Sequence, residues 1–105
     1  MDSQLKKGVL DVCVLAAVYS KDSYGYQIIK DLKDVIEISE STLYPILRRL
    51  EKNGYLTVYT QEHHYRLRKM YSITHEGKQR IEEYLKDLQE LKTITHYIEK
   101  ETTYD

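Results

Sequence analysis

Hydrophobic and polar positions follow different periods in different parts of the 105-residue chain. Residues 4–19 are apolar on nearly every face, which predicts a helix that is buried on more than one side. Residues 24–33 carry apolar positions four apart and predict a second, amphipathic helix. Ser23 is a suitable N-cap for that helix, and residues 35–38 then predict a short connector or a minimal strand.

The pattern from residue 40 to residue 53 predicts a third helix with two contrasting faces. Ser39 or Ser41 is expected to be its N-cap, and Gly54 ends it in the C′ position. Pro45 lies near the start, where it removes one backbone hydrogen bond. The inner face carries Leu43, Ile46, Leu47 and Leu50. The outer face carries Ser41, Tyr44, Pro45, Arg48 and Lys52.

Two runs rich in Val, Ile, Thr and Tyr, at residues 55–61 and 67–73, alternate in character and predict a β-hairpin. One face of the second strand carries Leu67, Lys69, Tyr71 and Ile73. The sequence between the two runs, residues 62–66, has no two-residue turn signal. We therefore expect a wider or a mobile loop there.

Thr74 is expected to cap a last helix that runs to about residue 100 and is roughly 35–40 Å long. Its heptad positions are Ile81, Tyr84, Leu88, Leu91, Thr95 and Ile98. Such a helix could pack on its own domain, but six positions in phase reach beyond a small domain and favour dimerisation. The first helix also has a second apolar side for a partner subunit. Its contribution to the predicted interface is Leu5, Val9 and Val12.

Length and composition limit what these elements can build. A chain of 105 residues forms one domain at most, with a small core. The net charge of −1 hides an uneven distribution. Residues 40–80 hold eight Lys or Arg and four Asp or Glu, a balance of +4, and the rest of the chain holds −5. The basic excess therefore coincides with the third helix and the hairpin.

The remaining side-chain chemistry predicts no enzyme, no metal and no cofactor. We find no phosphate loop and no nucleophile–base arrangement, and His63-His64 lacks a third ligand at a characteristic spacing. Cys13, the single cysteine, lies in an apolar helix and is expected to be a buried small hydrophobe. The absence of a possible internal disulfide suits a cytoplasmic location. We find no signal peptide and no long apolar run, so we expect no membrane association.

The outer face of the third helix suits a nucleic-acid contact. Arg48 and Lys52 stand four apart there, where like charges repel slightly. They could simply be solvated, but the neighbouring hydroxyl groups and the early helix terminus suit phosphate oxygens. Arg48 is the candidate for a base contact, through its bidentate geometry to guanine. The predicted DNA-contacting set on this helix is Ser41, Thr42, Tyr44, Pro45, Arg48 and Lys52.

The basic residues of the second strand allow two interpretations. Charges on an exposed edge strand prevent edge-to-edge pairing, and a wing that touches DNA needs the same side chains. We favour the wing for Arg66 and Arg68. Lys69 is included in the DNA-contacting set, although it shares a face with Leu67 and Tyr71 and could only cover the core.

Taken in order, these parts predict an α+β, mostly α fold. Residues 1–76 form a winged helix-turn-helix, a DNA-binding domain, and residues 77–105 form a dimerisation helix and tail. The basic face could instead bind an acidic protein partner, or a groove between subunits could sequester a ligand. An interaction module and a ligand-sequestering dimer are therefore the alternatives.

Three stretches of this chain resemble the PadR family of bacterial transcription regulators. They are Ser23-Tyr-Gly-Tyr-Gln-Ile-Ile-Lys-Asp-Leu, Ser39-Glu-Ser-Thr-Leu-Tyr-Pro-Ile-Leu-Arg-Arg-Leu-Glu-Lys-Asn-Gly and Arg68-Lys-Met-Tyr-Ser-Ile-Thr-His-Glu-Gly. The resemblance covers about residues 5–100. The single C-terminal helix is similar to that of the short subfamily.

The resemblance implies a homodimer in which the last helix meets the first helix of the other subunit. It also implies repression at a palindromic operator, often relieved by a small hydrophobic ligand. The DNA-facing positions that it implies are Tyr24, Ser41, Thr42, Tyr44 and Arg48. Some relatives stack planar drugs on a tryptophan of the last helix. This chain has no tryptophan, so Tyr84 or Tyr97 would be its substitute in a ligand cavity.

Overall fold

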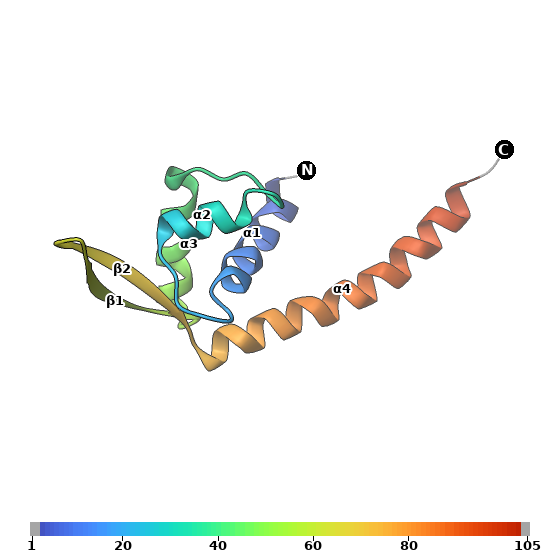
Figure 1. Cartoon of the computed structure of the whole chain (residues 1–105). Coiled ribbons are helices and arrows are strands. Elements are labelled where there is room, and N and C mark those ends of the chain that lie inside the picture. The colour runs from blue at the N-terminus through green and yellow to red at the C-terminus, as the bar shows by residue number, and fades with distance from the viewer. Residues whose placement is uncertain (1–2, 104–105) are drawn as a thin grey trace.

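The computed structural model describes residues 3–103, except for the side chains of residues 3–5 and 7. Its elements are α1 (Ser3–Ala17), α2 (Gly25–Leu32), α3 (Glu40–Lys52), β1 (Leu56–His63), β2 (Arg66–Ile73) and α4 (His75–Thr102). Figure 1 shows α1, α2 and α3 gathered in a bundle, from which the β1–β2 hairpin and α4 project in opposite directions. The predicted fold class, a winged helix with a long C-terminal helix, is confirmed.

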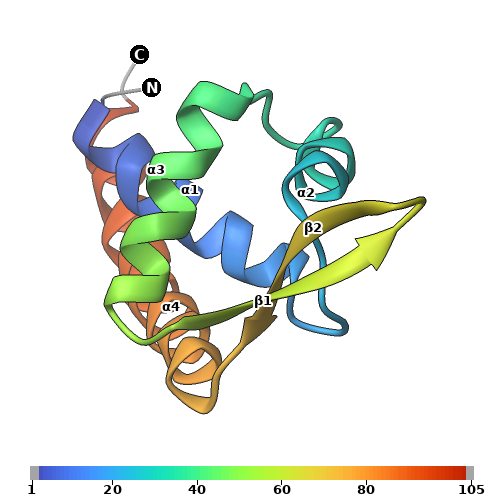
Figure 2. The same cartoon turned by 90° about the vertical axis from the view of Figure 1, so that its left-hand side faces the viewer.

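The hydrophobic core lies where the apolar faces of the first three helices meet. Val14 and Leu15 of α1, Ile28 of α2, and Leu43 and Leu47 of α3 are fully buried. Figure 2 shows α1 and α3 beside each other with α4 behind them. Because α1 packs against α2, α3 and α4, it needs apolar residues on several faces. The pattern of residues 4–19 is therefore explained largely within one protomer.

The third helix has the boundaries and the faces that its sequence predicts. Ser39 is the N-cap, and its side chain accepts a hydrogen bond of 3.3 Å from the backbone N–H of Thr42. Gly54 follows the C-cap with a φ of 82°, a left-handed conformation that favours glycine. The whole inner face is buried, namely Leu43, Ile46, Leu47 and Leu50. Its outer face is therefore held at the surface by packing behind it.

The hairpin ends in a tighter turn than its sequence predicts. β1 and β2 pair antiparallel as far as His63 and Arg66, which leaves a two-residue turn of His64 and Tyr65. Both turn residues have positive φ, 50° and 66°, the combination that two-residue hairpin turns require. The expectation of a wider loop across residues 62–66 was wrong. Continued pairing of the strands outweighs the cost of about 1–2 kcal/mol per left-handed residue.

Ser23 does not cap the second helix, so that prediction was wrong. The N-cap of α2 is Tyr24, whose side chain makes no capping hydrogen bond. Ser23 instead pairs with Tyr71 of β2 through two backbone hydrogen bonds of 3.1 and 2.8 Å. Its hydroxyl oxygen is buried without a partner. Backbone pairing therefore decides the position of Ser23, and ties the start of α2 to the hairpin.

Thr74 joins three segments at the start of the last helix. Its side chain accepts a hydrogen bond of 3.0 Å from the N–H of Gly77, as predicted for the N-cap. The same hydroxyl donates to the carbonyl of Gly54 at 2.6 Å. The Thr74 N–H donates to the carbonyl of Tyr55 at 3.1 Å. These bonds fix the first turn of α4 against the chain that leaves α3.

Most of α4 extends away from the bundle. The radius of gyration is 16.6 Å, compared with about 13 Å for a compact domain of this size, and the longest dimension is 65 Å. Ile81 packs against the core, whereas Leu91 and Ile98 are about half exposed. Within residues 3–103, no helix is both long and apolar enough to cross a membrane.

Gly77 makes a testable contribution to this junction. A Cβ atom at position 77 would overlap the carbonyl oxygen of Tyr55 and would lie 2.7 Å from Cγ1 of Ile73. Gly77→Ala is therefore expected to lower the free energy of unfolding by about 1–3 kcal/mol, despite the better helix propensity of alanine. Urea denaturation followed by circular dichroism measures this change.

Gln79→Ala provides the matched control, because it places the same residue at an exposed position of the same helix. We expect that change to stay within about 0.5 kcal/mol. Equal free energies of unfolding for the two variants would show that the first turn of α4 is not held in this close packing.

Candidate nucleic-acid interface

The outer face of α3 presents a continuous polar and basic surface. Ser41, Thr42, Pro45, Arg48 and Lys52 are all exposed. None of them takes part in a salt bridge within the described residues. The charges of Arg48 and Lys52 are therefore available to an external partner. The sequence predicted this face correctly as a surface, and its contacts with DNA stay a prediction.

The N-terminus of α3 carries a cluster of three hydroxyl groups. The Ser39 hydroxyl lies 2.9 Å from that of Ser41 and 3.2 Å from that of Thr42. Ser39 also accepts the capping bond from the Thr42 N–H. The cluster stands at the positive end of the helix dipole, where an anion such as a phosphate is favoured.

Tyr44 is set against the second helix rather than free in solvent. Its hydroxyl occupies the space beside Gly25, because a Cβ atom at position 25 would lie 2.6 Å from it. Burial raises the pKa of the Tyr71 phenol, and Tyr44 and Glu51 raise that pKa further, whereas Arg48 lowers it. The neutral Tyr71 phenol of the hairpin thus lies near Tyr44 and Arg48 of α3. Gly25 allows α2 and α3 to approach this closely.

Arg68 lies over an aromatic ring instead of pointing freely outward. Its guanidinium carbon is 3.7 Å from the centre of the Tyr24 ring. Both side chains are half-buried, and Nε of Arg68 is buried without a hydrogen-bond partner. The stack connects β2 to the start of α2, next to the backbone bridge between Ser23 and Tyr71. Two predicted DNA-contacting residues are therefore in contact with each other.

The remaining predicted wing residues stand at the surface. Arg66 and Lys69 are exposed, and so is Leu67, with 77% of its surface accessible. At the tip, Tyr65 is 96% exposed. This edge of the hairpin presents cations and an aromatic ring to solvent.

The paired histidines of the hairpin tip lie close together. Their ring centres lie 4.1 Å apart in an edge-to-face arrangement. Desolvation lowers the pKa of His63, and the nearby cation Arg68 and His64 lower it further. Within residues 3–103, no three His, Cys, Asp or Glu side chains converge to hold a metal ion.

A groove of about 360 Å³ separates the hairpin from α2 and α3. Its lining consists of Tyr24, Gly25, Tyr26, Tyr44, Leu67, Arg68, Lys69 and Tyr71. Tyrosine hydroxyls, two cations and the uncapped first turn of α2 therefore meet in one concave surface. Hydroxyl, ammonium and guanidinium groups are the ones that commonly bind the phosphates and sugars of a duplex.

An ion pair that the sequence did not predict braces α3 against α1. Nη2 of Arg49 contacts Oδ1 of Asp11, and both side chains are partly buried. The signal in the sequence was Asp11 itself, a single acidic residue within the apolar run of residues 9–18. A buried carboxylate needs a cation, but only the fold identifies Arg49 as that cation.

The predicted dimer surface divides into buried and exposed parts. Val12 is buried within the protomer, Val9 is half-buried, and the side chain of Leu5 lies outside the described residues. On α4, Ile81, Tyr84 and Leu88 are half-buried, whereas Leu91, Thr95 and Ile98 are exposed. The distal half of the heptad is therefore the part that a second chain would have to cover.

Tyr84 and Tyr97 do not line one cavity within a protomer. Both stand on the continuous helix α4, roughly 20 Å apart along its axis and on different sides of it. Tyr84 is half-buried, and Tyr97 is 64% exposed. A ligand cavity that uses both side chains would need residues from two protomers.

Comparison with known proteins adds a family to this geometry. The model of the transcriptional regulator PadR-like family matches residues 14–83. In fold and sequence the chain is similar to smu.1704 from Streptococcus mutans, with 42% identity, a TM-score of 0.78 and coverage of 93% of each chain. It is also similar to a PadR family transcriptional regulator from Eggerthella lenta, with 33% identity and a TM-score of 0.83. That match covers 95% of this chain and 88% of the other.

A third similar structure is that of Bacillus subtilis PadR in complex with operator DNA. It is 28% identical, with a TM-score of 0.69, and the match covers 73% of this chain and 46% of that one. The similarity therefore extends over less than half of the B. subtilis protein. Operator binding is a property of that protein.

The Arg68–Tyr24 stack is testable by conservative substitution. Arg68→Lys keeps the charge but loses the planar group that lies on the ring, at a cost of about 0.5–2 kcal/mol for a cation–π contact. We expect faster amide exchange at Tyr71 and a changed chemical shift of the Tyr24 ring, both measured by NMR. Arg66→Lys, at an exposed position of the same strand, should change neither. Unchanged exchange in Arg68→Lys would mean that the stack does not hold the hairpin.

Proposed function

We propose that this chain, which belongs to the PadR-like family of transcriptional regulators, binds operator DNA as a homodimer and represses transcription. In this proposal, residues 1–76 form the DNA-binding domain. Residues 77–105 form the dimerisation helix and tail. A dimer seated on a promoter would exclude other proteins from that DNA.

The observation that carries the proposal is the exposed, unpaired outer face of α3 beside a basic hairpin. Arg48 and Lys52 protrude from a helix whose opposite face is buried, so the helix is a rigid support for them. A helix of this kind fits the major groove, and a hairpin beside it reaches the backbone or the minor groove. The basic balance of residues 40–80 supports the same orientation.

Each side chain then has a role that its position supports. Arg48, near the middle of the outer face, is the candidate for a base contact. Ser41, Thr42, Tyr44, Pro45 and Lys52 would contact or border the backbone. The groove beside the hairpin would hold a phosphate between Tyr24, Arg68 and Lys69. Arg66 would lie along the neighbouring strand of the duplex.

Dimerisation would set the distance between two copies of α3. The half-exposed apolar residues of α4 favour contact with a partner chain. In this proposal the partner surface includes α1 of the second subunit. Two α3 helices about one turn of DNA apart would read a palindromic site. A small hydrophobic effector between the subunits, near Tyr84 and Tyr97, would change that distance and release the operator.

The base-contact role predicts a specific loss for Arg48→Ala. Affinity for an operator selected from a random duplex pool should fall by about 1–3 kcal/mol more than affinity for an unrelated duplex. Fluorescence anisotropy at several salt concentrations measures both affinities. Equal losses on the two duplexes would assign Arg48 to the backbone instead.

Lys52→Ala is the matched comparison from the same helix face. We expect it to weaken binding to both duplexes equally. It should also reduce the slope of log affinity against log salt concentration by about one. If the intact protein bound no duplex, or bound DNA without salt dependence, operator binding through this basic face would be excluded. An acidic protein partner would then be the better explanation of the basic face.

The dimer predicts a large effect of charge on α4. Leu91→Glu should raise the dimer dissociation constant on the order of 100-fold, because each interface would then bury two unpaired carboxylates. Sedimentation velocity measures the change in mass. Thr93→Glu is the control, since it adds the same charge on the opposite side of the helix. A Leu91→Glu protein that stays dimeric would place the interface elsewhere.

A further inference from the structure

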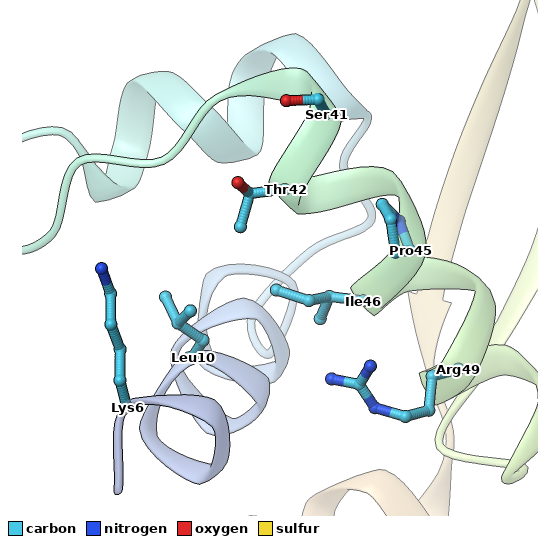
Figure 3. Close-up of a pocket in the computed structure, with 7 residues that line it drawn as sticks. All are labelled: Lys6, Leu10, Ser41, Thr42, Pro45, Ile46 and Arg49. Atoms are coloured by element: carbon cyan, nitrogen blue, oxygen red, sulfur yellow. The ribbon is translucent and has the colours of Figure 1, made fainter. Parts of the chain in front are cut away.

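A second groove, of about 390 Å³, lies between α1 and the N-terminal half of α3. Its lining is Lys6, Leu10, Ser41, Thr42, Pro45, Ile46 and Arg49. Figure 3 shows Lys6 and Leu10 on α1 facing Thr42 and Ile46 on α3 across the groove. It is separate from the groove beside the hairpin, and only its margin at Ser41, Thr42 and Pro45 overlaps the surface assigned to DNA above.

The lining combines an apolar floor with cations at its margin. Leu10 and Ile46 are almost completely buried, with 7% and 5% of their surface exposed, and Pro45 adds a third apolar surface. Lys6 is exposed and forms no salt bridge with any other described residue. Figure 3 shows its ammonium group toward the end of the groove where the Ser41 and Thr42 side chains lie. This end carries a cation and two hydroxyls.

The other end of the groove has a partly satisfied cation. Arg49 is paired with Asp11 through Nη2, but its Nε atom is buried without a hydrogen-bond partner. Pro45 has no N–H, so the carbonyl of Ser41 receives no helical hydrogen bond from it. Among the described residues, Lys6 is therefore the lining cation without a carboxylate partner, and its charge makes the groove positive.

We infer that this groove binds a small amphipathic monocarboxylate. The carboxylate would accept hydrogen bonds from the Lys6 ammonium and the Thr42 hydroxyl. An apolar body of about six to ten carbons would lie on Leu10, Pro45 and Ile46, because the volume is at the lower end of the range for small-ligand sites. The groove is too small for a helix of a partner protein. The Lys6 ammonium favours an anionic ligand over a neutral one.

The position of the groove gives the bound ligand a consequence that rests on the proposed DNA-binding function. Ser41, Thr42 and Pro45 belong both to the groove and to the surface assigned to DNA. A carboxylate at this flank of α3 would repel the phosphates of an approaching duplex. The ligand should therefore weaken DNA binding by about fivefold or more, and DNA should weaken ligand binding by the same factor.

Octanoate and its neutral counterpart octanamide are suitable probes for the full chain in the absence of DNA. Calorimetry should find the tighter binding for octanoate. Amide chemical shifts should change at residues 41–46 and near Leu10. Lys6→Gln should lower the octanoate affinity about threefold to fivefold, the range for an exposed ion pair, and should leave octanamide binding unchanged. Lys30→Gln, which removes another exposed lysine on α2, should change neither affinity.

Several outcomes would overturn the inference. Octanoate and octanamide of equal affinity would remove the role of Lys6, and shifts confined to residues 88–98 would place the ligand on α4. Absence of octanoate binding, together with a loss of DNA affinity in Lys6→Gln, would make the groove a phosphate contact instead. Because the probes are titrated without DNA, a failure here is distinct from a failure of operator binding.

Discussion

The orientation of the last helix depends on one junction, in which Thr74 is hydrogen-bonded to Gly54 and Tyr55 in the segment that leaves α3. Its hydroxyl accepts from Gly77 and donates to the Gly54 carbonyl, and its N–H donates to Tyr55. Gly54 itself stops α3, and Tyr55 precedes β1. The end of α3, the start of the hairpin and the start of α4 are therefore one rigid unit. Any partner that α4 holds is placed in a fixed relation to α3.

The outward face of α3 depends in turn on what lies behind and beside it. Buried leucines hold its back against α1 and α2, while Arg49 is paired with Asp11 on one flank. On the other flank, the Tyr44 hydroxyl fits beside Gly25. A helix that could rotate would present its polar side chains in no fixed direction. The contacts on both flanks of α3 prevent this rotation, so only its outer side chains can change conformation.

The sequence predicted the elements well and their connections less well. Periodicity located every helix and both strands, because burial of one face leaves a regular signal along the chain. Ser23 was misread since its role depends on pairing with Tyr71, a residue far away in sequence. The turn at His64 was misread because its residues are not typical of left-handed backbone. The need for a small residue at Gly77 becomes visible only when Tyr55 is placed against it.

The uneven distribution of charge determines which part of the molecule can approach a polyanion. Residues 81–102 of α4 hold three Lys or Arg and six Asp or Glu, a balance of −3, against +4 for residues 40–80. Figure 1 shows that α4 points away from the hairpin. A duplex attracted to α3 and the hairpin is thus repelled by the distal part of α4. The half-exposed apolar residues of that acidic arm are the ones that the proposed dimer would cover, so in this proposal the two surfaces of the small fold bind partners of opposite character.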